Sequence, residues 1–275
     1  EGVEVKKIHK ADSPNYLFVD VNIAKSAEAG TYYIPELPDK AAAGREIKVG
    51  VIGCGGRGSG AVDNVFEASD NIKITALADV FADRLNGLRD KIKNKYNQEV
   101  PEANCFVGFE SYKQLLDTDV DYVIFTAPPV FRPDHFKYAV EKNKHCFLEK
   151  PIAVDPKGYR TIMASAKQAQ AKNLVVICGT QRHHERPYVA AFEKISQGMI
   201  GEITGGNVYG NQSMLWYRNR EKGWSDMEWM IRDWVNWKWL SGDHIVEQHV
   251  HNIDVFLWMT GLKPVKATAF GARHR

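Results

Sequence analysis

Short apolar segments alternate with longer amphipathic segments between residues 47 and 178. Runs rich in β-branched and aliphatic residues predict strands, and segments in which apolar residues recur every three or four positions predict helices. The expected strands are 47–52, 72–78, 120–125, 145–148 and 174–178, and the expected helices are 61–68, 84–96, 133–142 and 156–172. This alternation is typical of the doubly wound α/β class, a parallel sheet with helices on both faces.

The chain on either side of this segment follows other patterns. Residues 3–8 and 16–23 predict two short strands of a hairpin, and residues 35–44 resemble a linker without a sustained period. Beyond residue 179 the alternation stops, and 203–209 and 265–270 predict strands of a separate sheet. We therefore expect an extension and linker over 1–44, an α/β domain over 45–178 and a second domain over 179–275.

A glycine-rich turn follows the first strand of the α/β domain. Residues 53–58 read G-C-G-G-R-G and contain G-x-G-x-x-G between a strand and a helix. The first glycine permits a tight turn, the second lets backbone approach a pyrophosphate, and the third lets helix and strand pack closely. A glycine-rich turn in another doubly wound fold is the alternative. The turn predicts a dinucleotide site at Gly53, Gly55, Gly56, Arg57 and Gly58.

An acidic residue ends the next expected strand. Asp79 lies 21 residues after Gly58, where a carboxylate would accept hydrogen bonds from both hydroxyls of an adenine ribose. Because this carboxylate would repel a 2′-phosphate, Asp79 favours NAD over NADP, although Arg84 weakens the preference. A helix cap at Asp79 is the structural alternative.

A lysine before a proline follows the expected strand 145–148. Glu149-Lys150-Pro151 places Lys150 at the carboxyl edge of the sheet, where ligands bind in open α/β folds, and proline permits a cis peptide bond. Desolvation and a nearby nicotinamide ring would lower the pKa of Lys150, which could then exchange a proton with a substrate hydroxyl. A solvated strand end is the alternative.

Residues 244–258 predict one helix with an apolar face and a polar stripe beside it. The stripe contains His244, Glu247, His251 and Asp254 and suggests the wall of an active site. Glu247, one turn before His251, would hydrogen-bond its imidazole, so that His251 could take the proton of an alcohol. A solvated face and a metal site are the alternatives. We expect no metal, because His249 and His251 lie on different sides of a regular helix.

Six tryptophans lie between Trp216 and Trp239, interleaved with charged residues. Flat rings with polar neighbours suit stacking against the apolar face of a sugar, while a core or a subunit interface is the alternative. In the first interpretation the substrate contacts are Trp216, Trp224, Arg232 and Trp234, together with His244 and Asp254.

Composition narrows the function classes. The 275 residues include 36 Lys and Arg against 34 Asp and Glu, a net charge of +2, without the basic block typical of nucleic-acid binders. No apolar run approaches the ~20 residues of a membrane span, and the four separated cysteines contain no C-x-x-C pair. We expect neither nucleic-acid nor membrane partners, and reduced thiols.

Taken together, these motifs resemble the Gfo/Idh/MocA family of oxidoreductases (glucose-fructose oxidoreductase, inositol dehydrogenase and rhizopine catabolism proteins), particularly its Bacteroidetes members. The resemblance covers roughly residues 30–275 and rests on the glycine turn, Asp79, Thr126-Ala127-Pro128-Pro129 with His135, residues 144–151 and residues 247–254.

The resemblance implies a Rossmann domain, an α/β domain with an open, largely antiparallel sheet that commonly mediates oligomerisation, and NAD(P)-dependent chemistry on a sugar or polyol hydroxyl. It assigns that chemistry to Lys150, Glu247 and His251, although the family usually has Asp at 247 and often Gly at 249. Further cofactor contacts are implied at Pro128, His135, Glu149 and Gln181, and a substrate contact at Arg182. Family members usually continue beyond position 275, so we expect an incomplete second domain, with homo-oligomers through its sheet where that domain is complete.

A second resemblance concerns the N-terminal residues. Residues 2–23 weakly resemble the opening strands of the β-sandwich that begins neopullulanase-type enzymes, which suggests a fusion or a misassembled reading frame.

The expected function is an NAD-linked oxidoreductase acting on a sugar, a glycoside or a polyol. One alternative is a glycosidase that uses NAD transiently, oxidising a sugar and eliminating its aglycone. The other is a truncated NAD-binding chain without catalysis. The sequence does not choose between cytoplasm and periplasm.

Overall fold

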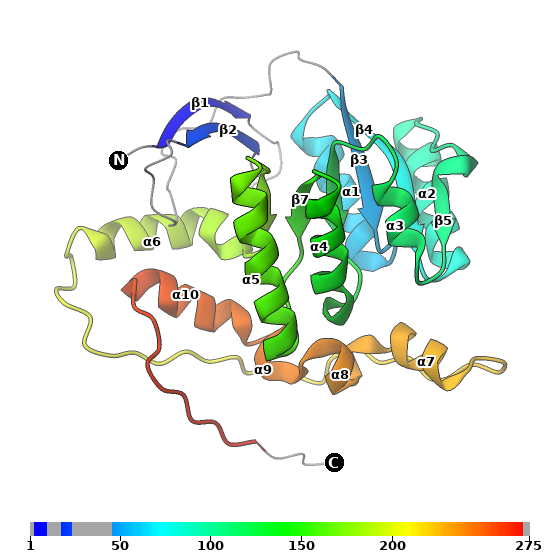
Figure 1. The fold of residues 1–275 in the computed structure, drawn as a ribbon. Helices are drawn as coiled ribbons and strands as arrows, with labels where there is room; N and C mark the ends of the chain where they lie inside the picture. Colours follow the sequence, from blue (N-terminus) through cyan, green and yellow to red (C-terminus); the bar gives the residue numbers. More distant parts are fainter. Residues whose placement is uncertain (1–2, 10–17, 24–45, 272–275) are drawn as a thin grey trace.

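The structure is a computed structural model that describes residues 3–9, 18–23 and 46–271. β1 (Val3–His9) and β2 (Phe18–Ile23) pair antiparallel, as the two short apolar runs predict (Figure 1). The expected linker over 35–44 and the boundary near residue 45 lie outside the described residues, so the domain division stays a prediction.

Six parallel strands form the central sheet. In chain order they are β3 (Ile47–Ile52), β4 (Ile72–Asp79), β5 (Cys105–Val107), β6 (Tyr122–Phe125), β7 (His145–Leu148) and β8 (Val176–Cys178). Their spatial order is β5-β4-β3-β6-β7-β8, with every pair parallel. The chain therefore winds outward in both directions from β3, and a ligand crevice is expected where the order reverses, between β3 and β6.

Helices cover both faces of this sheet, as Figure 1 shows. α1 (Gly56–Ala68) and α2 (Ala82–Tyr96) pack on one face around Val51, Ile74 and Leu77. α3 (Ser111–Leu116), α4 (Arg132–Glu141) and α5 (Pro156–Ala171) pack on the other face around Phe125 and Phe136. Strands buried on both faces explain the nearly continuous apolar runs, and the predicted doubly wound sheet is confirmed.

After β8 the chain forms helices only, among the residues that the structure describes. These are α6 (Arg186–Ser196), α7 (Asp226–Arg232), α8 (Lys238–Ser241), α9 (Asp243–Glu247) and α10 (Val250–Thr260), with short 3-10 turns η3 (Gln181–His184) and η4 (Trp234–Asn236). The strands expected at 203–209 and 265–270 do not form, because neither segment pairs with another strand in this part of the chain.

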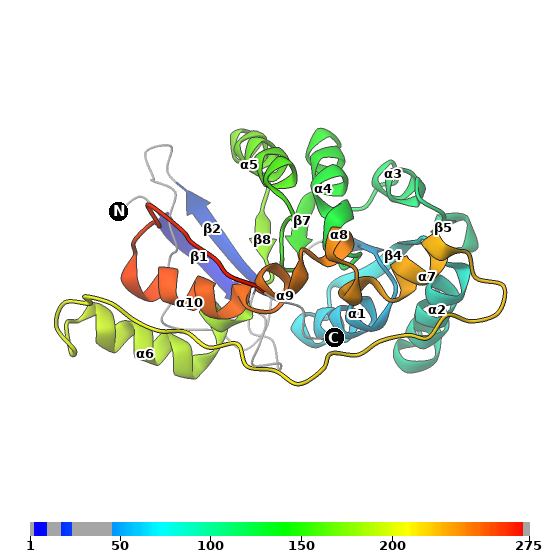
Figure 2. The ribbon, with the colours of Figure 1, turned by 90° about the horizontal axis from the view of Figure 1, so that it is seen from below.

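Residues 224–247, here called the edge segment, run along the carboxyl edge of the sheet (Figures 1 and 2). α7 lies near the start of α2, α8 contacts η2 (Pro129–Phe131) after β6, and α9 reaches the end of β7. No helix in the described part of the chain is long and apolar enough to cross a membrane.

Candidate cofactor and active site

Two of the turn glycines are fixed by packing. Gly53 has a φ of +98°, and a Cβ at this position would overlap the backbone nitrogen of Ala127. A Cβ at Gly58 would overlap the carbonyl oxygen of Gly53, so only glycine lets α1 approach β3 this closely. The turn thus needs glycine at both positions before any ligand is considered.

The other two glycines border open space. Cβ atoms built on Gly55 and Gly56 would meet nothing within 4 Å. Gly55 is also the N-cap of α1, and no side chain caps this helix, whose first amides lack intrahelical partners. A space in front of uncapped helix amides fits the diphosphate of a dinucleotide.

Asp79 is fixed beside this turn by two backbone hydrogen bonds. Its Oδ2 accepts from the Cys54 amide at 2.6 Å and its Oδ1 from the Phe81 amide at 2.8 Å. Burial raises the pKa of Asp79, while these two hydrogen bonds lower it. Phe81 precedes α2, so the carboxylate also helps to begin that helix, and each oxygen keeps a lone pair for a ribose hydroxyl.

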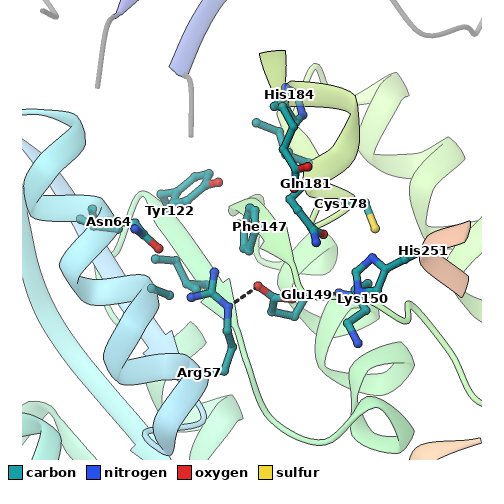
Figure 3. A pocket seen from close by; sticks show the side chains of 16 residues that line it. Arg57, Asn64, Tyr122, Phe147, Glu149, Lys150, Cys178, Gln181, His184 and His251 are labelled. Carbon is teal, nitrogen blue, oxygen red and sulfur yellow. Dashed lines mark hydrogen bonds and ion pairs between the residues drawn. The ribbon is translucent and has the colours of Figure 1, made fainter. Parts of the chain in front are cut away.

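A cavity of about 430 Å³ opens on the α1 face of β6, β7 and β8 (Figure 3). Its apolar part is lined by Tyr122, Ile124, Phe147 and Ile177 from the strands, together with Ala61 and Val65 from α1. Its polar part is lined by Arg57, Glu149, Lys150, Gln181 and His251. Five of the residues predicted from the sequence therefore meet around one cavity.

Arg57 and Glu149 form an ion pair in this polar part. The Arg57 Nε lies 2.6 Å from the Glu149 Oε1, and Glu149 is only 9% exposed (Figure 3). A solvated strand end, the alternative for the Glu149-Lys150-Pro151 sequence, is therefore wrong for Glu149. The pair joins the N-terminus of α1 to the end of β7.

Lys150 forms the next contact, with Glu247. The Lys150 Nζ donates to the Glu247 Oε1 at 2.8 Å and to its carbonyl oxygen at 2.6 Å, and both side chains are largely buried. The Glu247 Oε2 accepts from the Gln248 side chain. The peptide bond between Lys150 and Pro151 is cis.

The expected hydrogen bond from Glu247 to His251 is therefore not formed. One continuous helix over 244–258 was the basis of that expectation, but the helix is broken between α9 and α10. The His249 amide donates to the carbonyl of His244, five residues back, and this wide turn shifts the phase of the polar stripe. Glu247 consequently faces Lys150.

His251 lies at the same end of the cavity as Lys150 (Figure 3). Burial, helped by the positive charges of Lys150 and Arg182, lowers the pKa of His251 to about 4, against the opposing charge of Asp254. The imidazole is thus neutral at physiological pH and able to accept a proton.

A comparison with protein-family models shows what the chain is similar to. A model described as "Oxidoreductase family, NAD-binding Rossmann fold" (GFO_IDH_MocA) matches residues 47–177. The chain is similar to this oxidoreductase family over these residues. Residues 1–45 match a second model, "Cyclomaltodextrinase, N-terminal", which confirms the neopullulanase-like character of the N-terminal segment.

Similar proteins match the chain over part of their own length. The inositol 2-dehydrogenase of Salmonella typhimurium is 26% identical over 216 residues, which are 78% of this chain and 54% of that protein. A glycosyl hydrolase family 109 protein of Shewanella pealeana is 28% identical over 172 residues, 62% of this chain and 36% of that protein. The chain thus spans about half the length, or less, of these curated relatives.

A solved structure shows the same fold. The scyllo-inositol dehydrogenase from Lactobacillus casei with bound NAD(H) and scyllo-inositol has a TM-score of 0.57 and 23% identity, covering 79% of this chain and 57% of that one.

Arg182 and Asp254 lie beside the cavity but do not line it. The Arg182 guanidinium donates to the Asn252 side chain and lies 5.3 Å from the Tyr188 ring. Asp254 Oδ2 lies 2.7 Å from His183 Nε2. Both predicted substrate contacts therefore join η3 to α10.

His135 is not placed at the cavity. It is 8% exposed on the inner face of α4, stacked on the Tyr112 ring at 4.2 Å, and burial lowers its pKa to about 3, with the charge of Arg132 adding to the effect. The structure therefore places His135, where a cofactor contact was expected, in the core and not at the cavity. Pro128, by contrast, begins η2 at the carboxyl edge.

Arg132 is a buried residue that the sequence interpretation missed. Its Nη2 donates to the Ala127 carbonyl at 2.8 Å and its Nη1 to the Pro151 carbonyl, so it joins the loops that follow β6 and β7. Burial lowers the pKa of Arg132 to about 10. An arginine on an amphipathic helix usually predicts a solvated position, and no other signal marks this one.

The tryptophan-rich residues lie away from the cavity. None of the four predicted contacts Trp216, Trp224, Arg232 and Trp234 lines it. Trp216 and Trp234 meet edge to face at 6.0 Å, and Arg232 binds Asp83 in α2. His244 is exposed, with Nε2 3.1 Å from the Gly210 carbonyl. In the structure these rings contact one another and Arg232 rather than the cavity, and the sugar-stacking interpretation stays a prediction.

The described residues contain no group of three or more His, Cys, Asp or Glu side chains placed to hold a metal ion. All four cysteines are free, and burial raises the pKa of Cys178 to about 11.

Proposed function

We propose that the chain is an NAD-linked oxidoreductase that acts on a secondary hydroxyl of a sugar, a glycoside or a polyol. One observation supports this proposal. An ion-paired lysine, Lys150, and a neutral histidine, His251, lie at one end of a cavity whose other wall begins at the glycine turn. An acid–base pair next to a dinucleotide turn is what alcohol oxidation requires.

The residues of the turn fit the cofactor. The amides at Gly55 and Gly56 would bind the diphosphate, and Asp79 would accept hydrogen bonds from the ribose hydroxyls. Asp79 supports NAD rather than NADP, because a 2′-phosphate would lie against its carboxylate. When bound, NAD supplies the acceptor for the hydride that leaves the carbinol carbon.

Two side chains, His251 and Lys150, would act on the hydroxyl group of the substrate. A ring nitrogen of His251 would take the hydroxyl proton, since the neutral imidazole has a free lone pair at physiological pH. The Lys150 Nζ would donate to the substrate oxygen and stabilise its developing negative charge. Glu247 Oε1 and the Glu247 carbonyl hold that ammonium in place. Glu247 is therefore a positioning residue for Lys150.

The named relatives support a polyol or sugar substrate. Inositol 2-dehydrogenases match 78% of this chain, and the Lactobacillus casei structure holds NAD(H) with scyllo-inositol. Self-association through a second-domain sheet stays a prediction, because residues 179–271 form no such sheet.

A glycosidase that uses NAD transiently is the second candidate. Glycosyl hydrolase family 109 proteins are among the relatives at up to 28% identity. The same lysine and histidine could serve oxidation and then removal of a proton from the carbon next to the carbonyl. A chain that binds NAD without catalysis is the third candidate.

One experiment separates these functions. The purified protein is titrated with NAD by calorimetry, then incubated with NAD and a panel of inositols, sugars and aryl glycosides. Reduced nicotinamide accumulating with a polyol or sugar supports the oxidoreductase, whereas aglycone release without net reduction supports the glycosidase. Binding without either product supports the non-catalytic alternative, and no binding contradicts the proposal.

A further inference from the structure

The edge segment (residues 224–247) is attached to the first α/β region along its whole length. At its beginning Arg232 binds Asp83, which lies four residues after Asp79. Further along, α8 contacts η2, and Gly242 lies so near Val154 that a Cβ on the glycine would touch the Val154 side chain. At its end Glu247 binds Lys150. The segment therefore joins the adenine end of the expected cofactor crevice to the lysine at its nicotinamide end (Figure 2).

Arg232 makes the most extensive of these contacts. Its Nη1 and Nη2 donate to the two carboxylate oxygens of Asp83 at 2.9 and 2.8 Å, and its Nε donates to Glu228 at 3.0 Å. The guanidinium carbon lies 3.9 Å from the centroid of the Phe81 ring and 4.9 Å from that of Trp224. The Arg232 side chain is only 10% exposed. Bidentate pairing and stacking on a ring fix both the distance and the plane of the group.

These contacts reach the residues that carry the ribose acid. The Phe81 amide donates to Asp79 Oδ1, so the residue under the Arg232 guanidinium also holds the Asp79 carboxylate. Asp83 lies in the first turn of α2, immediately beyond. Arg232 thereby links the edge segment to Phe81 in the turn between β4 and α2 and to Asp83 in the first turn of α2.

We propose that Arg232 is a positioning residue for the adenosine half of the cofactor. It holds residues 79–83 in the conformation that binds the adenine ribose and keeps the edge segment across the crevice, which slows release of the dinucleotide. This inference rests on the proposed function, and it explains why Arg232 binds Asp83 at the start of α2 instead of lining the cavity.

The test compares Arg232→Gln with a matched control, Arg220→Gln. Arg220 lies in the chain just before the edge segment and also pairs with an aspartate, Asp226, at 2.6 Å, but both partners are solvent-exposed. Calorimetry measures the affinity of each variant for three probes: NAD, ADP-ribose, which contains the adenosine half, and nicotinamide mononucleotide, which lacks it. Stopped-flow fluorescence measures the rate of NADH release.

Arg232→Gln is expected to weaken NAD and ADP-ribose about tenfold, the typical loss for a charge-assisted bidentate pair, and to speed NADH release by a similar factor. Affinity for nicotinamide mononucleotide and all values for Arg220→Gln stay within about twofold of the wild type. In steady-state assays of Arg232→Gln with an active substrate, the KM for NAD is expected to rise while kcat stays unchanged. Asp83→Asn reproduces the effect, and the double variant is no weaker than either single variant because the two side chains act as one contact.

Unchanged ADP-ribose affinity in Arg232→Gln contradicts the inference, as does an equal loss for nicotinamide mononucleotide, which would indicate a general structural role. If Arg232→Gln does not fold, Asp83→Asn decides, since its side chain is 59% exposed. If Arg232→Gln and Asp83→Asn bind NAD as well as the wild type does, only this inference is contradicted. A wild-type protein that binds no NAD contradicts the proposed function as well.

Discussion

The two regions on either side of residue 179 bury their side chains very differently. In residues 46–178, helices such as α2 and α4 bury several side chains completely against the sheet. In residues 179–271, α6 and α10 bury none completely, and α9 buries only Glu247. The second region supplies Glu247, which binds Lys150 of the first region, and His251 on α10, which packs on α6, η3 and α9. The core and the proposed cofactor turn therefore lie in the first region, and the second region adds two side chains to the site.

The largest difference is expected in unfolding free energy, between replacing a completely buried side chain of the first region and replacing a half-buried one of the second. Replacing Phe136, a completely buried residue of α4, with alanine is expected to cost about 3–5 kcal/mol of unfolding free energy. Leu257 in half-buried α10 is expected to cost about 1 kcal/mol in the same replacement. Denaturant unfolding measures both variants. Equal losses would mean that the second region contributes to the core as much as the first.

The next largest effect concerns Lys150, where the regions meet. Lys150→Met removes the ammonium beside the substrate oxygen and is expected to lower kcat at least about a hundredfold. Glu247→Gln keeps the ammonium but weakens its fixed position, so a smaller fall in kcat is expected. Steady-state rates with the active substrate measure both. A Glu247→Gln enzyme slower than Lys150→Met would show that Glu247 itself takes part in the chemistry.

A glycine variant separates binding from folding within the first region. Gly55→Ala places a methyl group in open space, so unfolding free energy is expected to change by less than about 1 kcal/mol. The same methyl group would occupy the place of the diphosphate, and NAD affinity is expected to fall about tenfold or more. Gly58→Ala is the control that should fail in folding, because its Cβ overlaps the Gly53 carbonyl. Full NAD affinity in Gly55→Ala would show that the diphosphate does not bind at this turn.

The smallest expected effect is that of pH on His251. Because the folded-state pKa is lowered to about 4, the neutral base is fully present at pH 6 and above, and it is lost as the pH falls through 4. The kcat/KM for alcohol oxidation is therefore expected to show an acidic limb near pH 4 rather than near 6.5. The stability that this neutral, half-buried imidazole contributes is present above the unfolded pKa of about 6.5 and declines below it. An acidic limb that remains in His251→Asn belongs to another group.

The sequence predicted the first region well because its apolar period is set by burial on both faces of a sheet. Strands such as 145–148 and helices such as 156–172 appear within a residue or two of their expected bounds. β5 and α3 were missed, since three and six residues are too few to show a period.

The site was predicted in part. Local signals found the glycine turn and Lys150, which lie next to buried strands. They did not find the partner of Glu247, because the break at residues 248–249 has no glycine or proline to mark it. Nor did they find that Arg232 binds α2, because that contact joins Arg232 to Asp83, 149 residues apart in the chain.

The central claim is that the glycine turn and Asp79 hold an NAD molecule. Parallel calorimetric titrations of the wild type with NAD and NADP, repeated on Gly55→Ala, test it most directly. Saturable NAD binding with one site per chain, NADP at least about tenfold weaker, and loss of both in Gly55→Ala are expected. No saturable binding of either nucleotide, or equal binding by Gly55→Ala, would contradict it.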